Sequence, residues 1–183
     1  MNTYISMLRG INVSGQNMIK MGDLKSLYES LGFLNVRTYL QSGNVVFDSP
    51  ASDYLELSNT IAAQIKQTLG FTIPVFIRSG DDFGWVLANN PFINDRHEDL
   101  TRMYVTFLFQ KVDVDKIKNL AAPANVTDEF IFGENEIYLF CPDGYGRTKL
   151  NNNFFEKKLN TPATTRNWNT VNALYQMTRE NNG

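Results

Sequence analysis

The spacing of hydrophobic and polar positions predicts the order strand–helix–strand–strand–helix–strand in residues 1–90. Apolar side chains recur at spacings of three and four in two segments, a pattern typical of amphipathic helices. Short runs rich in β-branched and aromatic residues stand before, between and after these segments. We expect strands at residues 4–9, in both arms of a hairpin over 36–49 and at 72–78, with helices at 21–32 and 53–70.

The same order recurs later in the chain, after a helix at residues 81–90 and a polar linker at 91–101. Arg78 and Arg166, which each end an expected strand, are separated by 88 positions (166 − 78). A repeated element order of this kind indicates two similar structural units. The expected strands are residues 103–110, both arms of a hairpin over 128–142 and 162–167, and the expected helices are 112–120, 151–160 and 167–180.

We therefore predict an α+β fold of two ferredoxin-like βαββαβ halves, each with an antiparallel sheet and an extra helix after it. The first half would span residues 1–90, and a linker over 91–101 would lead to the second half at 102–183. The pattern leaves open whether the two halves form one compact unit.

This topology predicts where the polar loops gather. The strand order of such a half is 4-1-3-2, so the end of the first strand lies beside the turn of the hairpin. The loop GINVSGQN would therefore lie next to QSGN, and similar reasoning brings DGYGRTKL and TTRN to one edge of the second sheet, where they could bind an anion. The expected ligand-binding residues are Arg9, Asn12, Asn17, Ser42 and Asn44 in the first half and Arg147, Lys149, Arg166 and Asn167 in the second.

Several kinds of chemistry are disfavoured by the residues present. A P-loop needs Lys and Ser or Thr directly after its second glycine, but Gln16 and Asn17 stand there. GINVSGQN is then either a structural connection that uses Gly and Asn for left-handed conformations or a ligand-binding loop. Cys141 and His97 are the only residues of their kinds, too few for a usual zinc site. We assign no catalytic residue, metal or cofactor.

Composition adds limits on partners and compartment. The chain has 183 residues, of which 43% are hydrophobic, and a net charge of −2, so nothing indicates a nucleic-acid or membrane surface. No apolar run is long enough to span a membrane, and the N-terminus lacks the pattern of a signal peptide. A single cysteine suits a reducing compartment. We expect a cytoplasmic protein; self-association stays open.

Three phrases carry a family resemblance: SMLRGINVSGQNMIKMGDLKSLYESLGF, VRTYLQSGNVVFDS and TTRNWNTVNAL. From Met7 to about Leu174 the chain resembles the bacterial family called domain of unknown function 1697, apart from Ser14, where the family often has a second glycine. The resemblance implies a tandem ferredoxin-like α+β fold. It implies no activity and no catalytic residues.

Together these patterns favour a module that binds a small anionic or nucleotide-like ligand at loops rich in glycine and asparagine. One alternative is a metal-independent enzyme on such a ligand, in which Asp23 or Tyr39 would move a proton. Another is an RNA- or protein-interaction module that uses an open sheet face, although the RNA-recognition signature is absent.

Overall fold

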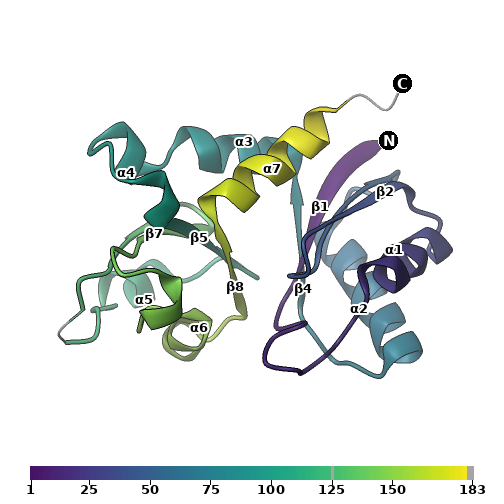
Figure 1. Cartoon of the computed structure of the whole chain (residues 1–183), viewed down its shortest axis with the longest axis horizontal. Coiled ribbons are helices and arrows are strands. Elements are labelled where there is room, and N and C mark those ends of the chain that lie inside the picture. The colour runs from purple at the N-terminus through teal and green to yellow at the C-terminus, as the bar shows by residue number, and fades with distance from the viewer. Residues whose placement is uncertain (125, 181–183) are drawn as a thin grey trace. The chain divides into compact units, whose positions relative to one another are not determined.

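The computed structural model describes residues 1–124 and 126–180 (Figure 1). In the first half the sheet order is β2-β3-β1-β4 and every neighbouring pair is antiparallel, as predicted for a ferredoxin-like half. The elements of this half are β1 (Asn2–Leu8), α1 (Met21–Ser30), β2 (Leu34–Tyr39), β3 (Asn44–Ser49), α2 (Tyr54–Leu69), β4 (Val75–Ser79) and α3 (Gly80–Ala88).

The second half repeats this topology, with sheet order β6-β7-β5-β8 and antiparallel pairing throughout. The α+β fold of two ferredoxin-like halves is therefore confirmed. The remaining helices and strands are α4 (Pro91–Asn94), β5 (Met103–Leu108), α5 (Val114–Lys118), β6 (Glu129–Phe132), β7 (Glu136–Phe140), α6 (Asn152–Leu159), β8 (Ala163–Asn167) and α7 (Trp168–Arg179), with single 3-10 turns at Leu100–Arg102 and Tyr145–Arg147.

Contacts divide the chain into two units whose limits differ from those expected from the sequence. Among the described residues, the first unit comprises 1–83 and 174–180, and the second comprises 84–124 and 126–173. The limits of the units therefore fall within α3 and within α7. Element order alone places limits between elements, so it could not predict a limit inside a helix. The segment expected to be a linker, 91–101, also contains α4, with Phe92 fully buried.

Helices α1 and α2 pack on one face of the first sheet and enclose its hydrophobic core. Helix α2 has a defined start, because the Asp53 carboxylate accepts hydrogen bonds from the backbone N–H groups of Leu55 and Glu56 at 2.8 and 2.9 Å. Its C-terminal cap, Gly70, has φ 78°. Within this core the Tyr28 hydroxyl hydrogen-bonds the Ser6 hydroxyl at 2.6 Å, and burial raises the pKa of Tyr28.

The second unit has a smaller core between its sheet and the short helices α5 and α6. Cys141 lies within it and is fully buried. Burial raises the pKa of its thiol to about 12, so the thiol stays protonated and is a poor nucleophile at neutral pH. Among the described residues, no helix has the length and apolar character needed to cross a membrane.

Candidate functional site

The loop between β1 and α1 is organised by the side chain of Asn12. Its amide nitrogen donates to the carbonyl oxygens of Ile19 at 3.0 Å and of Gln41 at 2.8 Å. Its amide oxygen accepts from the backbone N–H of Ile19 at 2.8 Å. Asn12 therefore closes its own loop and ties that loop to the turn between β2 and β3.

The same loop holds an unusual backbone conformation. Asn12, Ser14 and Asn17 have φ values of 53°, 51° and 46°, in the left-handed region that residues other than glycine rarely occupy. Asn17 supports this path, because its side-chain amide donates to the carbonyl of Gly10 at 3.0 Å. These side-chain bonds add to two backbone hydrogen bonds within the loop, from Asn12 to Asn17 at 3.2 Å and from Gln16 to Val13 at 2.9 Å.

The turn between β2 and β3 lies against this loop, as the topology predicts. The backbone N–H of Leu8 donates to the carbonyl of Gly43 at 2.9 Å. The buried Asn44 donates to the carbonyl of Tyr39 and to the hydroxyl of Ser42, at 3.0 and 2.9 Å. These contacts stabilise the turn, so Asn12, Asn17 and Asn44 all use their amides to shape protein loops.

A cavity of about 390 Å³ adjoins the loop. Arg9 is the only charged residue among the described residues that line it, and it is partly exposed. The backbone N–H of Arg9 donates to the carbonyl of Pro74 at 3.1 Å, which joins the loop to the start of β4. The cavity is lined by Arg9, Gly10, Val13, Ser14, Gln16, Asn17, Thr72, Ile73 and Pro74.

The basic cluster expected in the second half does not assemble as one site. Arg147 and Lys149 line a cavity of about 250 Å³, together with Asp128 and Asp143. Neither Arg166 nor Asn167 is among the described residues that line it.

Arg166 and Asn167 do not share this cavity wall with Arg147 and Lys149, and the alternation of side chains along β8 separates them further. Arg166 and Asn167 are consecutive in β8, so their side chains point to opposite faces of the sheet. The Arg166 guanidinium donates to the Thr164 hydroxyl and the Thr165 carbonyl, at 2.8 and 2.9 Å. The side-chain oxygen of Asn167 accepts from the backbone N–H of Thr170 at 2.8 Å and caps α7.

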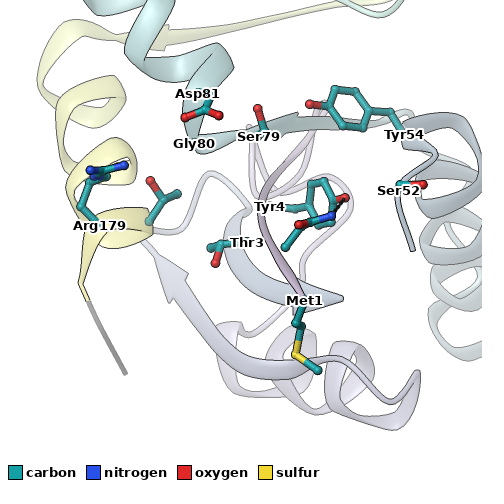
Figure 2. Close-up of a pocket in the computed structure, with 11 residues that line it drawn as sticks. Met1, Thr3, Tyr4, Ser52, Tyr54, Ser79, Gly80, Asp81 and Arg179 are labelled. Carbon is teal, nitrogen blue, oxygen red and sulfur yellow. Dashed lines mark hydrogen bonds between the residues drawn. The ribbon is translucent and has the colours of Figure 1, made fainter. Parts of the chain in front are cut away.

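Another cavity, of about 440 Å³, was missed by the sequence reasoning (Figure 2). It is lined by the start of β1, the start of α2, the junction of β4 with α3 and the end of α7. One signal was readable: Ser79 and Asp82 have the spacing of a capping box. Nothing in the sequence placed Arg179 beside that box. Across the described part of the chain, no three His, Cys, Asp or Glu side chains are grouped as metal ligands would be.

The fold is that of a tandem ferredoxin-like α+β protein, in which asparagine side chains hold the loop and the turn at one edge of the first sheet. Residues 1–138 match the family described as protein of unknown function DUF1697, and the chain belongs to that family. The match ends within β7, so the phrase TTRNWNTVNAL lies outside it. One similar solved structure is the conserved bacterial protein SP0830 from Streptococcus pneumoniae. It is 27% identical with a TM-score of 0.74, over 97% of this chain and 98% of that one. No curated protein matches.

Proposed function

We propose that this protein is a cytoplasmic binding module for a small anionic or nucleotide-like ligand. The ligand would occupy the cavity beside the loop between β1 and α1. The observation that carries this proposal is the position of Arg9 as the single charged residue among the described residues of that cavity wall. A guanidinium can form two parallel hydrogen bonds to a carboxylate or a phosphate, so the charge and its geometry both suit an anion.

The backbone of the loop supports a binding role. Left-handed conformations at residues other than glycine cost free energy and cluster at functional sites. Three of them, at Asn12, Ser14 and Asn17, fall in this one loop. Asn12 and Asn17 hold the loop in place before any ligand arrives, which lowers the entropic cost of binding. Ser14 and Gln16 line the same cavity and offer neutral polar contacts.

The lining residues favour binding over catalysis. Among the described residues of this wall there is no Asp, Glu, His or Cys that could serve as a general base or a nucleophile. Asp23 and Tyr39, the proton carriers considered for an enzyme, are not among the lining residues either. The volume of about 390 Å³ is within the usual range for small-molecule sites.

The test is a thermal-shift titration with adenosine monophosphate and inorganic phosphate, with adenosine as the uncharged comparison, at constant ionic strength. We expect one or both anions to raise the unfolding temperature of the wild type and adenosine to have less effect. Arg9→Gln should weaken anion binding about tenfold or more, because a charge-assisted hydrogen bond is lost.

Lys20→Gln is the matched control, since Lys20 is an exposed cation next to the loop but outside the cavity wall. It should leave binding within about twofold of the wild type, because contacts between exposed charges are weak. The proposal fails if neither anion stabilises the wild type at about 10 mM, where millimolar binding would still be visible. It also fails if the same anion binds Arg9→Gln as tightly as it binds the wild type.

A further inference from the structure

We propose that the cavity of about 440 Å³ in the first unit is a second binding site, for a zwitterionic α-amino acid. Asp81 would bind the ammonium group of the ligand, and Arg179 would bind its carboxylate. This site is separate from the cavity beside Arg9, and the two share no lining residue. The inference therefore does not depend on the proposed anion site.

The cavity is formed by four segments that are distant in the sequence. Figure 2 shows Thr3 and Tyr4 on β1, Tyr54 at the start of α2, and Ser79 to Asp81 where β4 passes into α3. Arg179 comes from the last turn of α7. The volume of this cavity is within the usual range of small-molecule sites and exceeds that of the cavity beside Arg9.

Most neutral groups of the wall are held by the protein itself. The Tyr54 hydroxyl donates to Oδ2 of Asp82 at 2.6 Å, and the backbone N–H of Ser79 donates to the same oxygen at 2.7 Å. The backbone N–H of Asp82 donates back to the Ser79 hydroxyl at 3.1 Å. The Tyr4 hydroxyl donates to the carbonyl of Ala51 at 2.7 Å. These contacts make the wall a prebuilt surface.

The two charged side chains of the wall differ from these neutral groups. Asp81 and Arg179 are exposed and line the same cavity, yet neither has a hydrogen-bond or ion-pair partner within residues 1–124 and 126–180. They do not pair with each other. The neighbouring Asp82, in contrast, is used in the structural contacts of the wall. The cavity therefore presents one carboxylate and one guanidinium that are both available to a ligand.

These two charges select the class of ligand. A simple anion would be attracted by Arg179 and repelled by Asp81. A simple cation would be attracted by Asp81 and repelled by Arg179. A molecule with an ammonium and a carboxylate on the same carbon atom can satisfy both, because each charge finds a partner of opposite sign. Free α-amino acids are the commonest small molecules of this kind, which is why we commit to that class.

A close helix contact keeps the two charged residues near the same cavity. A Cβ atom added to Gly80 would stand 2.7 Å from the Thr178 hydroxyl, nearer than real side-chain contacts allow. Glycine at this position therefore lets the start of α3 approach the end of α7 closely. Asp81 and Arg179 each follow one of these two contacting residues directly in the sequence.

The test is ligand-observed saturation-transfer NMR with the twenty common L-amino acids, one at a time, followed by calorimetry on the strongest binder. We expect at least one to bind with a millimolar or lower Kd. Its N-acetyl derivative lacks the ammonium and its amide lacks the carboxylate, so each should bind at least about tenfold more weakly.

Variants locate the site. Asp81→Asn and Arg179→Gln should each weaken binding about tenfold or more, whereas Glu29→Gln and Lys25→Gln, an exposed pair on α1 outside the cavity, should not. Both residues under test are exposed, so these changes should leave folding intact, which circular dichroism checks. The proposal is overturned if no amino acid binds, if the derivatives bind equally well, or if the wall variants bind like the wild type.

Discussion

Each half of the molecule secures the end of its first strand with the same pair of backbone hydrogen bonds. One bond runs from that strand to the hairpin turn, between Leu8 and Gly43 in the first half and between Leu108 and Asn135 in the second. The other runs to the residue before the last strand of each half. It joins Arg9 to Pro74 at 3.1 Å in the first half and Phe109 to Pro162 at 3.0 Å in the second.

The halves differ in the loops and helices that connect these equivalent strands. The first half connects its first strand to its first helix through residues 9–20, with the asparagine-held loop, whereas the second half uses only 109–113. The second helix of the first half, α2, is also longer: it has 16 residues, whereas its counterpart α6 in the second half has 8. Arg9 corresponds to Phe109, so the charge of the proposed anion site has no counterpart. The two halves therefore share their topology, and the asparagine-held loop is present only in the first half.

The largest expected effect concerns the contact between the first-half turn and its loop. Gly43 has φ 75°, and a Cβ there would stand 2.5 Å from Cδ1 of Ile11 and 2.9 Å from Cβ of Leu8. We expect Gly43→Ala to lower the free energy of unfolding by about 2 to 4 kcal/mol, measured by urea denaturation, because it adds both strain and overpacking.

Gly15→Ala is the matched control for that substitution. Gly15 has the same φ of 75° but open space around it, so its loss should reflect backbone conformation alone, about 1 kcal/mol. Equal losses at the two positions would mean that the close approach of turn and loop does not stabilise the first half.

The next effect concerns the loop that only the first half has. Asn12→Ala removes three hydrogen bonds, to Ile19 and Gln41, and should cost about 1.5 to 3 kcal/mol in the same measurement. Asn119→Ala in the second half removes one exposed bond to the carbonyl of Asp115 and should cost less. If the two variants lose equal stability, the asparagine bonds do not hold the loop.

The helices after the two sheets test how far the likeness extends. Ser79 caps α3 through the backbone N–H of Asp82, and Asn167, 88 positions later (167 − 79), caps α7 through that of Thr170. Replacing either cap by Ala should cost about 1 kcal/mol in denaturant unfolding. Asp in place of each keeps an acceptor oxygen and should retain most of the stability. A loss of stability at only one of the two caps would show that α3 and α7 do not begin in equivalent ways.

The smallest expected effect is a pH-dependent change in stability that arises in the second half only. In the second unit Arg96 donates to both carboxylate oxygens of Glu129, at 2.7 and 2.9 Å, and these hydrogen bonds lower the pKa of Glu129 below its ordinary value of 4.5. A lowered folded-state pKa means that the contact stabilises the protein above about pH 4.5 and that this stability is lost as the pH falls through the folded-state value.

Arg96→Gln should therefore reduce the urea midpoint slightly at pH 7 and by less at pH 3. The effect is small because exposed ion pairs contribute little. In Asn12→Ala the loss should be similar at both pH values, since neutral amides do not titrate. An equal effect of Arg96→Gln at both pH values would contradict the assigned contact.

Much of the architecture was predictable because its signals are local. The spacing of Leu24, Leu27 and Tyr28 marks the buried face of α1, and the apolar run around Val45 marks a buried strand. Strand order then follows from the βαββαβ succession. The site was less predictable: the loop and turn were expected to meet, and they do, but the amides of Asn12 and Asn17 face protein carbonyls. Residue type could not distinguish an amide that binds a ligand from one that holds its own loop.

The sequence by itself thus determined the element order, the two ferredoxin-like halves and the meeting of GINVSGQN with QSGN, because hydrophobic period and turn residues act over short distances. Only the tertiary structure decided which groups the Arg166 guanidinium binds, and that Asp81 and Arg179 line one cavity. The hydrogen-bond partners of a side chain depend on the groups that packing brings to it, and the meeting of distant residues depends on how the elements pack. Neither quantity is written in the spacing of residues along the chain.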